Sequence, residues 1–151
     1  MKKVCFVCLG NICRSPMAEF VMKDLAGAEG WLIESRATSG WEHGNPIHHG
    51  TQSIFKKHNI SYDKHKSSQQ ISRKDFYDFD VIIGMDAENV ADLKHMSQGK
   101  YDDKIFLFVK GGVPDPWFTG DFDATYDLVK RGCEQWLTWL KKFLKREVEQ
   151  K

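Results

Sequence analysis

The sequence has no large surplus of either charge and no long apolar run, and both shortages exclude classes of function. Lys and Arg total 22 against 21 Asp and Glu, which leaves a net charge of +1. A chain this balanced has no global field that attracts nucleic acid or an anionic membrane, so any anion it binds must be held locally. The basic start turns apolar but is interrupted at Gly10 and Asn11, which argues against a signal peptide or membrane span. We therefore expect a cytoplasmic protein without nucleic-acid or membrane partners.

Cysteine is also scarce, and this scarcity excludes a secreted disulfide scaffold. Four cysteines in 151 residues should remain thiols in a reducing compartment, where they serve packing or reactivity. The histidines form no H-E-x-x-H pattern and the cysteines no repeated C-x2-C pairs, so we expect neither a metal nor another cofactor. A hydrophobic content of 41% over this length predicts a single domain, residues 1–151, with one sizeable core.

Apolar runs typical of buried strands alternate with segments of helical periodicity. This order predicts an α/β three-layer sandwich with a four-stranded parallel sheet, helices on both faces and a ligand site beyond the carboxyl ends of the strands. Residues 110–122 are expected to form a loop. The expected strands are 3–7, 31–35, 80–84 and 105–109, and helices are expected from Ser15, after Pro46, from Ser72, over 87–94 and through Leu128 to Leu144.

The stretch VCLGNICRSP connects the first strand to the first helix. Backbone N–H groups of such a turn, together with the helix N-terminus, form a positively polarised cradle for an oxyanion. Gly10 allows the tight turn, Asn11 tolerates a left-handed backbone, and the Arg14 guanidinium can bind two phosphate oxygens at once. We therefore predict binding of phosphate or other oxyanions here.

Cys8 is the cysteine at this cradle, and a helix N-terminus beside an arginine favours its thiolate form. The thiolate would be a nucleophile directed at phosphorus. Ser15 is predicted as the helix N-cap and as a donor to the Cys8 sulfur. Cys5 and Cys133 are interpreted as core residues. Cys13 either contributes packing and a backbone amide or forms a reversible disulfide with Cys8.

The segment from Val7 to Pro16 resembles the signature of the low-molecular-weight protein tyrosine phosphatases. Further resemblances lie at TSGW (38–41), HKSSQQI (65–71), GMD (84–86) and the Asp115-Pro116 pair, so they extend over nearly the whole chain. The resemblance implies hydrolysis of phosphotyrosine in proteins, and of small aryl phosphates, through a phosphocysteine intermediate. It assigns catalysis to Cys8, Arg14 and Asp115, the last as general acid and base, and substrate binding to Leu9, Gly10, Asn11, Ile12, Cys13, Ser15, Trp41 and Trp117.

Within this site, the resemblance places Trp41 and Trp117 as walls for a phenyl ring and Leu9 and Ile12 at the floor. The exposed loop position of Phe118 makes it a further wall candidate. The resemblance also implies that His65 supports the loop through Asn11, and the alternative is an exposed loop histidine. Asp86 is the next candidate acid after Asp115.

Four other functions are alternatives to this one. A thiol–disulfide oxidoreductase would use Cys5 and Cys8, but three residues of one strand separate them by ~10 Å. An arsenate reductase on the same fold needs further cysteines, and residues 80–100 contain none. Phosphoarginine phosphatases resemble this loop with threonine at the position of Ile12. A binding module without catalysis would have no use for the Cys8 thiol or for Asp115.

Overall fold

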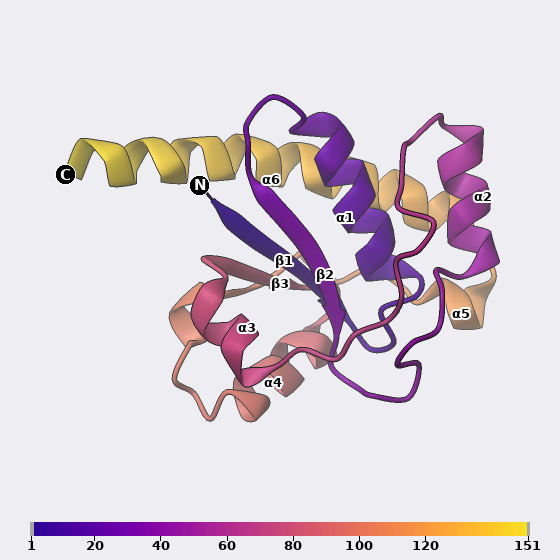
Figure 1. Ribbon diagram of the computed structural model, residues 1–151, viewed down its shortest axis with the longest axis horizontal. Coiled ribbons are helices and arrows are strands. Elements are labelled where there is room, and N and C mark those ends of the chain that lie inside the picture. The colour runs from indigo at the N-terminus through magenta and orange to yellow at the C-terminus, as the bar shows by residue number, and fades with distance from the viewer. Residues whose placement is uncertain (1, 151) are drawn as a thin grey trace.

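Four parallel strands form the central sheet of the computed structural model (Figure 1). The structure describes residues 2–150, with side chains described for residues 2–143. One of the two inner strands, β1, is almost entirely buried, as its unbroken apolar run predicts. In the order β2-β1-β3-β4 across the sheet, the strands are β2 (Leu32–Ala37), β1 (Lys3–Cys8), β3 (Val81–Gly84) and β4 (Ile105–Leu107).

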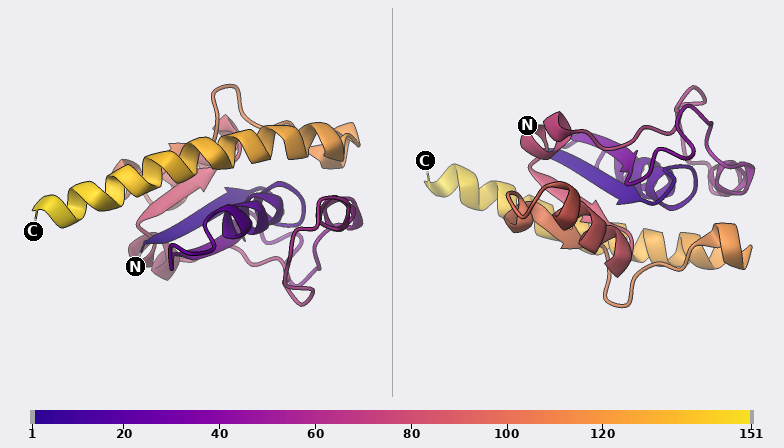
Figure 2. Two further views of the ribbon diagram at one scale, coloured as in Figure 1. Left: turned by 90° about the horizontal axis from the view of Figure 1, so that it is seen from above. Right: turned by 90° about the horizontal axis from the view of Figure 1, so that it is seen from below.

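Helices cover both faces of this sheet, which confirms the predicted three-layer α/β sandwich (Figure 2). On one face, α1 (Arg14–Leu25) and the long α6 (Phe122–Gln150) pack against each other. On the other face lie α3 (Arg73–Asp78) and α4 (Ala87–Met96). Within the described residues, no helix is long and apolar enough to cross a membrane.

The remaining helices are short. Of these, α2 (His49–Lys57) and the single turn α5 (Pro116–Thr119) lie near the carboxyl ends of the strands (Figure 1). A 3₁₀ turn, Asp102–Lys104, leads into β4. The loops that follow β1 and β4 therefore meet α2 and α5 at one edge of the sheet.

The alternation of side chains along β1 separates its two cysteines. Cys5 packs in the cluster beneath α3 and α4, whereas Cys8 belongs to the cluster beneath α1 and α6. Burial raises the pKa of the Cys5 thiol far above its ordinary value, so this sulfur stays protonated. Side chains on opposite faces of a sheet cannot form a disulfide, which argues against the thiol–disulfide oxidoreductase.

Two local predictions were wrong. The first helix begins at Arg14 with Cys13 as N-cap and no capping side chain, because the Ser15 hydroxyl bonds instead to Cys8 and Asn11. The segment 110–122, expected to be a loop, contains the turn α5. Proline at the first helical position and the Asp115 carboxylate, which accepts the Trp117 N–H, together start this turn.

Candidate active site

Residues 8–14, the phosphate loop, join β1 to α1 with most of their carbonyl oxygens bonded to surrounding elements. In a trans peptide the carbonyl and the next N–H point in opposite directions, so anchoring these carbonyls outward turns the following N–H groups towards the inside of the loop. Such a concave row of N–H groups suits the binding of an oxyanion, and we keep the name cradle for it. The donors are Thr38 N to Cys8 O (2.9 Å), Ser39 Oγ to Leu9 O (2.8 Å), Ser68 Oγ to Gly10 O (2.7 Å), His48 N to Ile12 O (2.9 Å) and Thr51 Oγ1 to Cys13 O (3.2 Å).

Asn11 has a left-handed backbone, with φ of 56°, and its side chain holds the loop in that conformation. Its Nδ2 donates to Ser15 Oγ (2.8 Å) and Ser35 Oγ (2.9 Å), while its Oδ1 accepts the Gln69 N–H (3.1 Å). Its own N–H points to Cys8 Sγ at 3.2 Å. The Asn11 amide therefore ties the loop together, as predicted. The structure adds that it does so from behind the loop.

Cys8 lies at the bottom of the cradle, with 3% of its surface exposed. Ser15 Oγ is 3.0 Å from Cys8 Sγ. Because Ser15 Oγ already accepts a hydrogen bond from Asn11, its own proton is available to the sulfur, or to the Arg36 carbonyl at 3.4 Å. The two atoms are therefore within hydrogen-bond distance, and either of them can be the donor.

The Arg14 guanidinium is buried and held at the side of the cradle. Its Nη1 donates to Asp86 Oδ2 (2.5 Å) and to the Val113 carbonyl (3.0 Å), and its Nη2 lies 3.5 Å from Asp115 Oδ2. Burial by itself lowers the pKa of Arg14, but the Cys8 sulfur, Asp86 and Asp115 outweigh it and raise the pKa above its ordinary value. The side chain is therefore a fixed cation.

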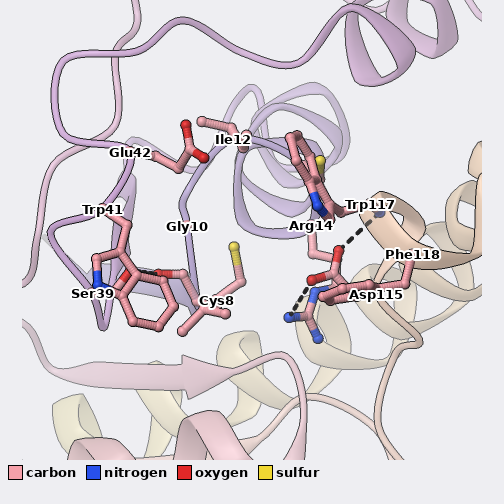
Figure 3. A pocket seen from close by; sticks show the side chains of 12 residues that line it. Cys8, Gly10, Ile12, Arg14, Ser39, Trp41, Glu42, Asp115, Trp117 and Phe118 are labelled. Atoms are coloured by element: carbon pink, nitrogen blue, oxygen red, sulfur yellow. Dashed lines mark hydrogen bonds and ion pairs between the residues drawn. The ribbon is translucent and has the colours of Figure 1, made fainter.

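The two candidate acids occupy different places around Arg14. Asp115 lines the pocket, where its Oδ1 accepts the Trp117 N–H (3.1 Å) and its Oδ2 faces Arg14 (Figure 3). Asp86 does not line the pocket, because its Oδ2 binds Arg14 and its Oδ1 caps α4 through the Asn89 N–H (2.8 Å). This geometry favours Asp115 as the acid and leaves Asp86 to orient the guanidinium.

A cavity of about 220 Å³ opens above the cradle. It is larger than the ~150 Å³ cavity that holds benzene in an engineered protein core. Trp41 and Trp117, which are 80% and 55% exposed, stand on opposite sides of it, and Phe118 lies beside Asp115 (Figure 3). The complete lining is Cys8, Leu9, Gly10, Ile12, Cys13, Arg14, Ser39, Trp41, Glu42, Asp115, Trp117 and Phe118.

Sequence reasoning missed Ser39 and Glu42 in this lining. A Cβ at Gly10 would lie 3.3 Å from Glu42 Cγ, so a side chain there would require Glu42 to shift by a few tenths of an ångström. The signal for both residues was their place in the loop that carries Trp41. Asn11 and Ser15 lie behind the lining and act on the pocket through Cys8 and the loop backbone.

The expected support of Asn11 by His65 is wrong. His65 is exposed, and its backbone N–H donates to Asp63 Oδ1 (2.8 Å). The Asn11 carboxamide is instead bonded to Ser15, Ser35 and the Gln69 backbone.

A buried carboxylate, Glu19, completes this support. With 1% of its surface exposed, it accepts the Ser35 hydroxyl (2.6 Å) and the ammonium groups of Lys66 (3.1 Å) and Lys23 (2.6 Å). Ser35 in turn accepts from Asn11, so a charge-paired chain ends behind the phosphate loop. A glutamate on a helix usually indicates an exposed face, which is why this network could not be predicted from the sequence.

No group of three or more histidine, cysteine or acidic side chains in the described part of the chain is placed to hold a metal ion.

Comparison with known proteins places this site in a family. Residues 3–150 match the family model described as low molecular weight phosphotyrosine protein phosphatase. The low molecular weight protein-tyrosine-phosphatase YfkJ of Bacillus subtilis is 44% identical, covering 94% of this chain and 97% of that protein. The crystal structure of SP-PTP, a low molecular weight protein tyrosine phosphatase from Streptococcus pyogenes, is 63% identical with a TM-score of 0.92, covering 96% of this chain and 98% of the other.

A further solved structure is of a protein named for a different substrate. The crystal structure of DARP, a Drosophila arginine phosphatase, is 34% identical with a TM-score of 0.83, covering 93% of this chain and 98% of the other. The family model and the relatives agree in fold and in nearly complete coverage. This chain therefore belongs to the low molecular weight protein-tyrosine-phosphatase family of enzymes.

Proposed function

We propose that the enzyme hydrolyses phosphotyrosine in proteins, and small aryl phosphates, through a phosphocysteine intermediate on Cys8. The phosphate binds in the loop with its oxygens on the inward N–H groups and the Arg14 guanidinium. The Cys8 thiolate attacks phosphorus, and the bond from phosphorus to the phenolic oxygen breaks. Asp115 gives its proton to that oxygen, so the leaving group departs as a neutral phenol.

The second step returns the enzyme to its starting state. Asp115, now a carboxylate, takes a proton from a water that attacks the phosphorus of the phosphocysteine. The sulfur–phosphorus bond breaks, inorganic phosphate is released and the Cys8 thiolate is restored. The Ser15 hydroxyl, 3.0 Å from the sulfur, stabilises the thiolate as leaving group, and Arg14 balances the charge on the phosphate oxygens.

The observation that carries this proposal is the placement of Cys8, Arg14 and Asp115 around one cavity, with the sulfur at its bottom. The aromatic side chains of Trp41 and Trp117 favour an aryl substrate over a short alkyl one. Ile12 supplies a buried apolar floor, which offers no partner to the polar guanidinium of phosphoarginine. These features favour phosphotyrosine over the phosphoarginine alternative that the DARP similarity raises.

Cys5 and Cys133 do not support arsenate reduction. Cys5 and Cys133 have no exposed surface, and burial raises the pKa of each far above its ordinary value. Neither thiol is placed to pass an oxidation onward from Cys8.

The test compares wild type with Cys8→Ser and Arg14→Ala on matched peptides carrying phosphotyrosine, phosphoserine or phosphoarginine, with arsenate reduction as a further assay. We expect turnover of phosphotyrosine that both substitutions abolish. Cys5→Ala is the matched control, because it removes a buried thiol from the same strand and should leave turnover unchanged. Faster cleavage of phosphoarginine, or equal losses at Cys5 and Cys8, would contradict the proposal.

A further inference from the structure

His48 connects the two parts of the active site, and neither the family signature nor the proposed mechanism assigns it a role. Its backbone N–H donates to the carbonyl of Ile12 in the phosphate loop at 2.9 Å. Its imidazole meets the Trp117 ring edge-to-face, with the ring centroids 5.6 Å apart and the planes at 79°. The backbone N–H of Trp117 donates a hydrogen bond to the Asp115 carboxylate. One residue therefore contacts the cradle with its backbone and the acid-bearing turn with its side chain.

The imidazole of His48 is fixed on its other sides. It stacks on His49, with centroids 4.3 Å apart, and on Phe122 at the start of α6, with centroids 5.1 Å apart. Its Nδ1 accepts the Gly50 N–H (3.0 Å) and so caps α2. A Cβ on Gly50 would lie 2.5 Å from the Phe122 ring, so glycine is required for this close packing. The ring therefore presents a fixed surface to Trp117.

The turn that carries Asp115 is largely exposed, since Pro116 is its one buried residue. It has a single helical turn, and two of its side chains, Trp117 and Phe118, are 55% and 80% exposed. A short, exposed turn has little packing of its own to hold it in one place. General acid catalysis nevertheless requires the carboxyl group to lie within hydrogen-bond distance of the leaving oxygen.

We propose that His48 is a positioning residue. Its neutral imidazole contacts the Trp117 ring and thereby holds Asp115 over the cavity. This inference rests on the proposed role of Asp115 as the acid. The bond at Nδ1 requires neutral imidazole, because a protonated Nδ1 would direct a second N–H at the Gly50 N–H.

The surroundings of His48 favour that neutral form. Burial lowers its pKa and the neighbouring His49 lowers it further, while the carboxylates of Asp115 and Glu42 act in the opposite direction without reversing the shift. The contact should therefore be intact at neutral pH and be lost as the pH falls through this lowered pKa.

Two complementary variants separate the ring of His48 from its cap. His48→Asn keeps a side-chain acceptor for Gly50 but removes the ring, and His48→Phe keeps a ring beside Trp117 but removes the cap. We expect His48→Asn to lower kcat/KM for phenyl phosphate by about tenfold or more, since small displacements of a catalytic group are costly, and for nitrophenyl phosphate by less than about threefold. His48→Phe should retain both rates and show a lower Tm.

The matched control is His58→Gln. His58 ends the same helix and stacks on Tyr126 of α6, with centroids 3.9 Å apart, far along α2 from the acid-bearing turn. The His58→Gln substitution removes an equivalent contact between α2 and α6. We expect no change in kcat/KM that depends on the leaving group. Equal losses on both substrates in His48→Asn would overturn the proposal.

A double-variant cycle tests whether His48 acts through Asp115. In an Asp115→Asn background, His48→Asn should cause no further loss on phenyl phosphate, whereas additive losses would refute the coupling. The indole signal of Trp117 should also titrate with His48 in wild type and not in His48→Asn. The Trp136 indole, which donates to the Phe108 carbonyl (2.7 Å), serves as internal reference. A wild-type enzyme inactive on both substrates would instead refute the proposed function. The Trp117 titration does not depend on that function and still tests the contact with His48.

Discussion

Replacing Asp115 with asparagine separates its proposed proton transfer from its place in the fold. Asparagine keeps an oxygen that can accept the Trp117 N–H, now bonded at 3.1 Å, so the turn α5 should keep its N-cap. The second side-chain atom, 3.5 Å from Arg14 Nη2, becomes an amide nitrogen whose protons are far too weakly acidic to be transferred to a leaving oxygen. Arg14 retains its bonds to Asp86 and the Val113 carbonyl, so the phosphate site should survive.

The expected loss depends on the leaving group. A positioned general acid contributes about 10²–10⁴ in rate, which corresponds to about 2.7–5.4 kcal/mol of barrier. We expect kcat/KM for phenyl phosphate to fall by that factor in Asp115→Asn. Nitrophenolate is a weak base and leaves without a proton, so kcat/KM for nitrophenyl phosphate should fall by less than about tenfold.

Pre-steady-state kinetics provide a second readout of the same variant. Without a base to activate water, Asp115→Asn should release one equivalent of nitrophenol in a burst and then turn over slowly. The decline of kcat/KM for phenyl phosphate towards alkaline pH, expected of an acid that must be protonated, should disappear.

Asp86→Asn is the matched comparison, because it removes the other carboxylate from Arg14 without touching the cavity. Asp86→Asn should lower kcat/KM for every substrate by a similar factor, since Arg14 binds phosphate whatever the leaving group. The reasoning is refuted if Asp115→Asn loses the same factor on phenyl and nitrophenyl phosphate. Asp115 would then be a capping residue of α5, and the acid would have to be another group.

Two further predictions concern the remainder of the loop and its support. Mild peroxide should inactivate the enzyme reversibly, because a sulfenic acid on Cys8 can condense with the Cys13 thiol to form a disulfide and release water. This disulfide would protect Cys8 from further oxidation. Peptide mass mapping that finds Cys8 only as sulfinic or sulfonic acid would exclude such protection. Glu19→Gln should lower the free energy of unfolding by about 2 kcal/mol, less than the 3–5 typical of a broken buried pair because Lys23 is partly exposed. Urea unfolding would measure it, and Glu19→Gln/Lys66→Met should recover part of the loss.

The sequence was sufficient to predict the sheet and the convergence of the main site residues. Parallel strands end at a common edge, so Cys8 at the end of β1 and Asp115 in the segment after β4 had to lie near one another. The left-handed backbone of Asn11 could also be anticipated, since asparagine tolerates that conformation better than most residues.

What could not be predicted depends on contacts between distant segments. Ser15 has the residue type and position of an N-cap, but the Asn11 amide and the Cys8 sulfur compete for its hydroxyl and shift the helix start to Arg14. The sequence also does not show that Lys66 and not the neighbouring His65 joins the support behind the loop, because the turn at residues 64–65 decides which of the two side chains is exposed. Lys66 reaches Glu19 while His65 faces solvent.

The two halves of the site are held in different ways, and this difference predicts how substitutions will act. The phosphate loop is anchored through its carbonyls and through the three hydrogen bonds of the Asn11 side chain, so its N–H groups are in place before any phosphate arrives. Asp115 stands on an exposed single turn that His48 contacts from one side. Changes behind the loop should therefore affect all substrates alike, because every substrate uses the cradle. Changes around Trp117 should instead alter discrimination between leaving groups, because only poor leaving groups depend on where the acid stands.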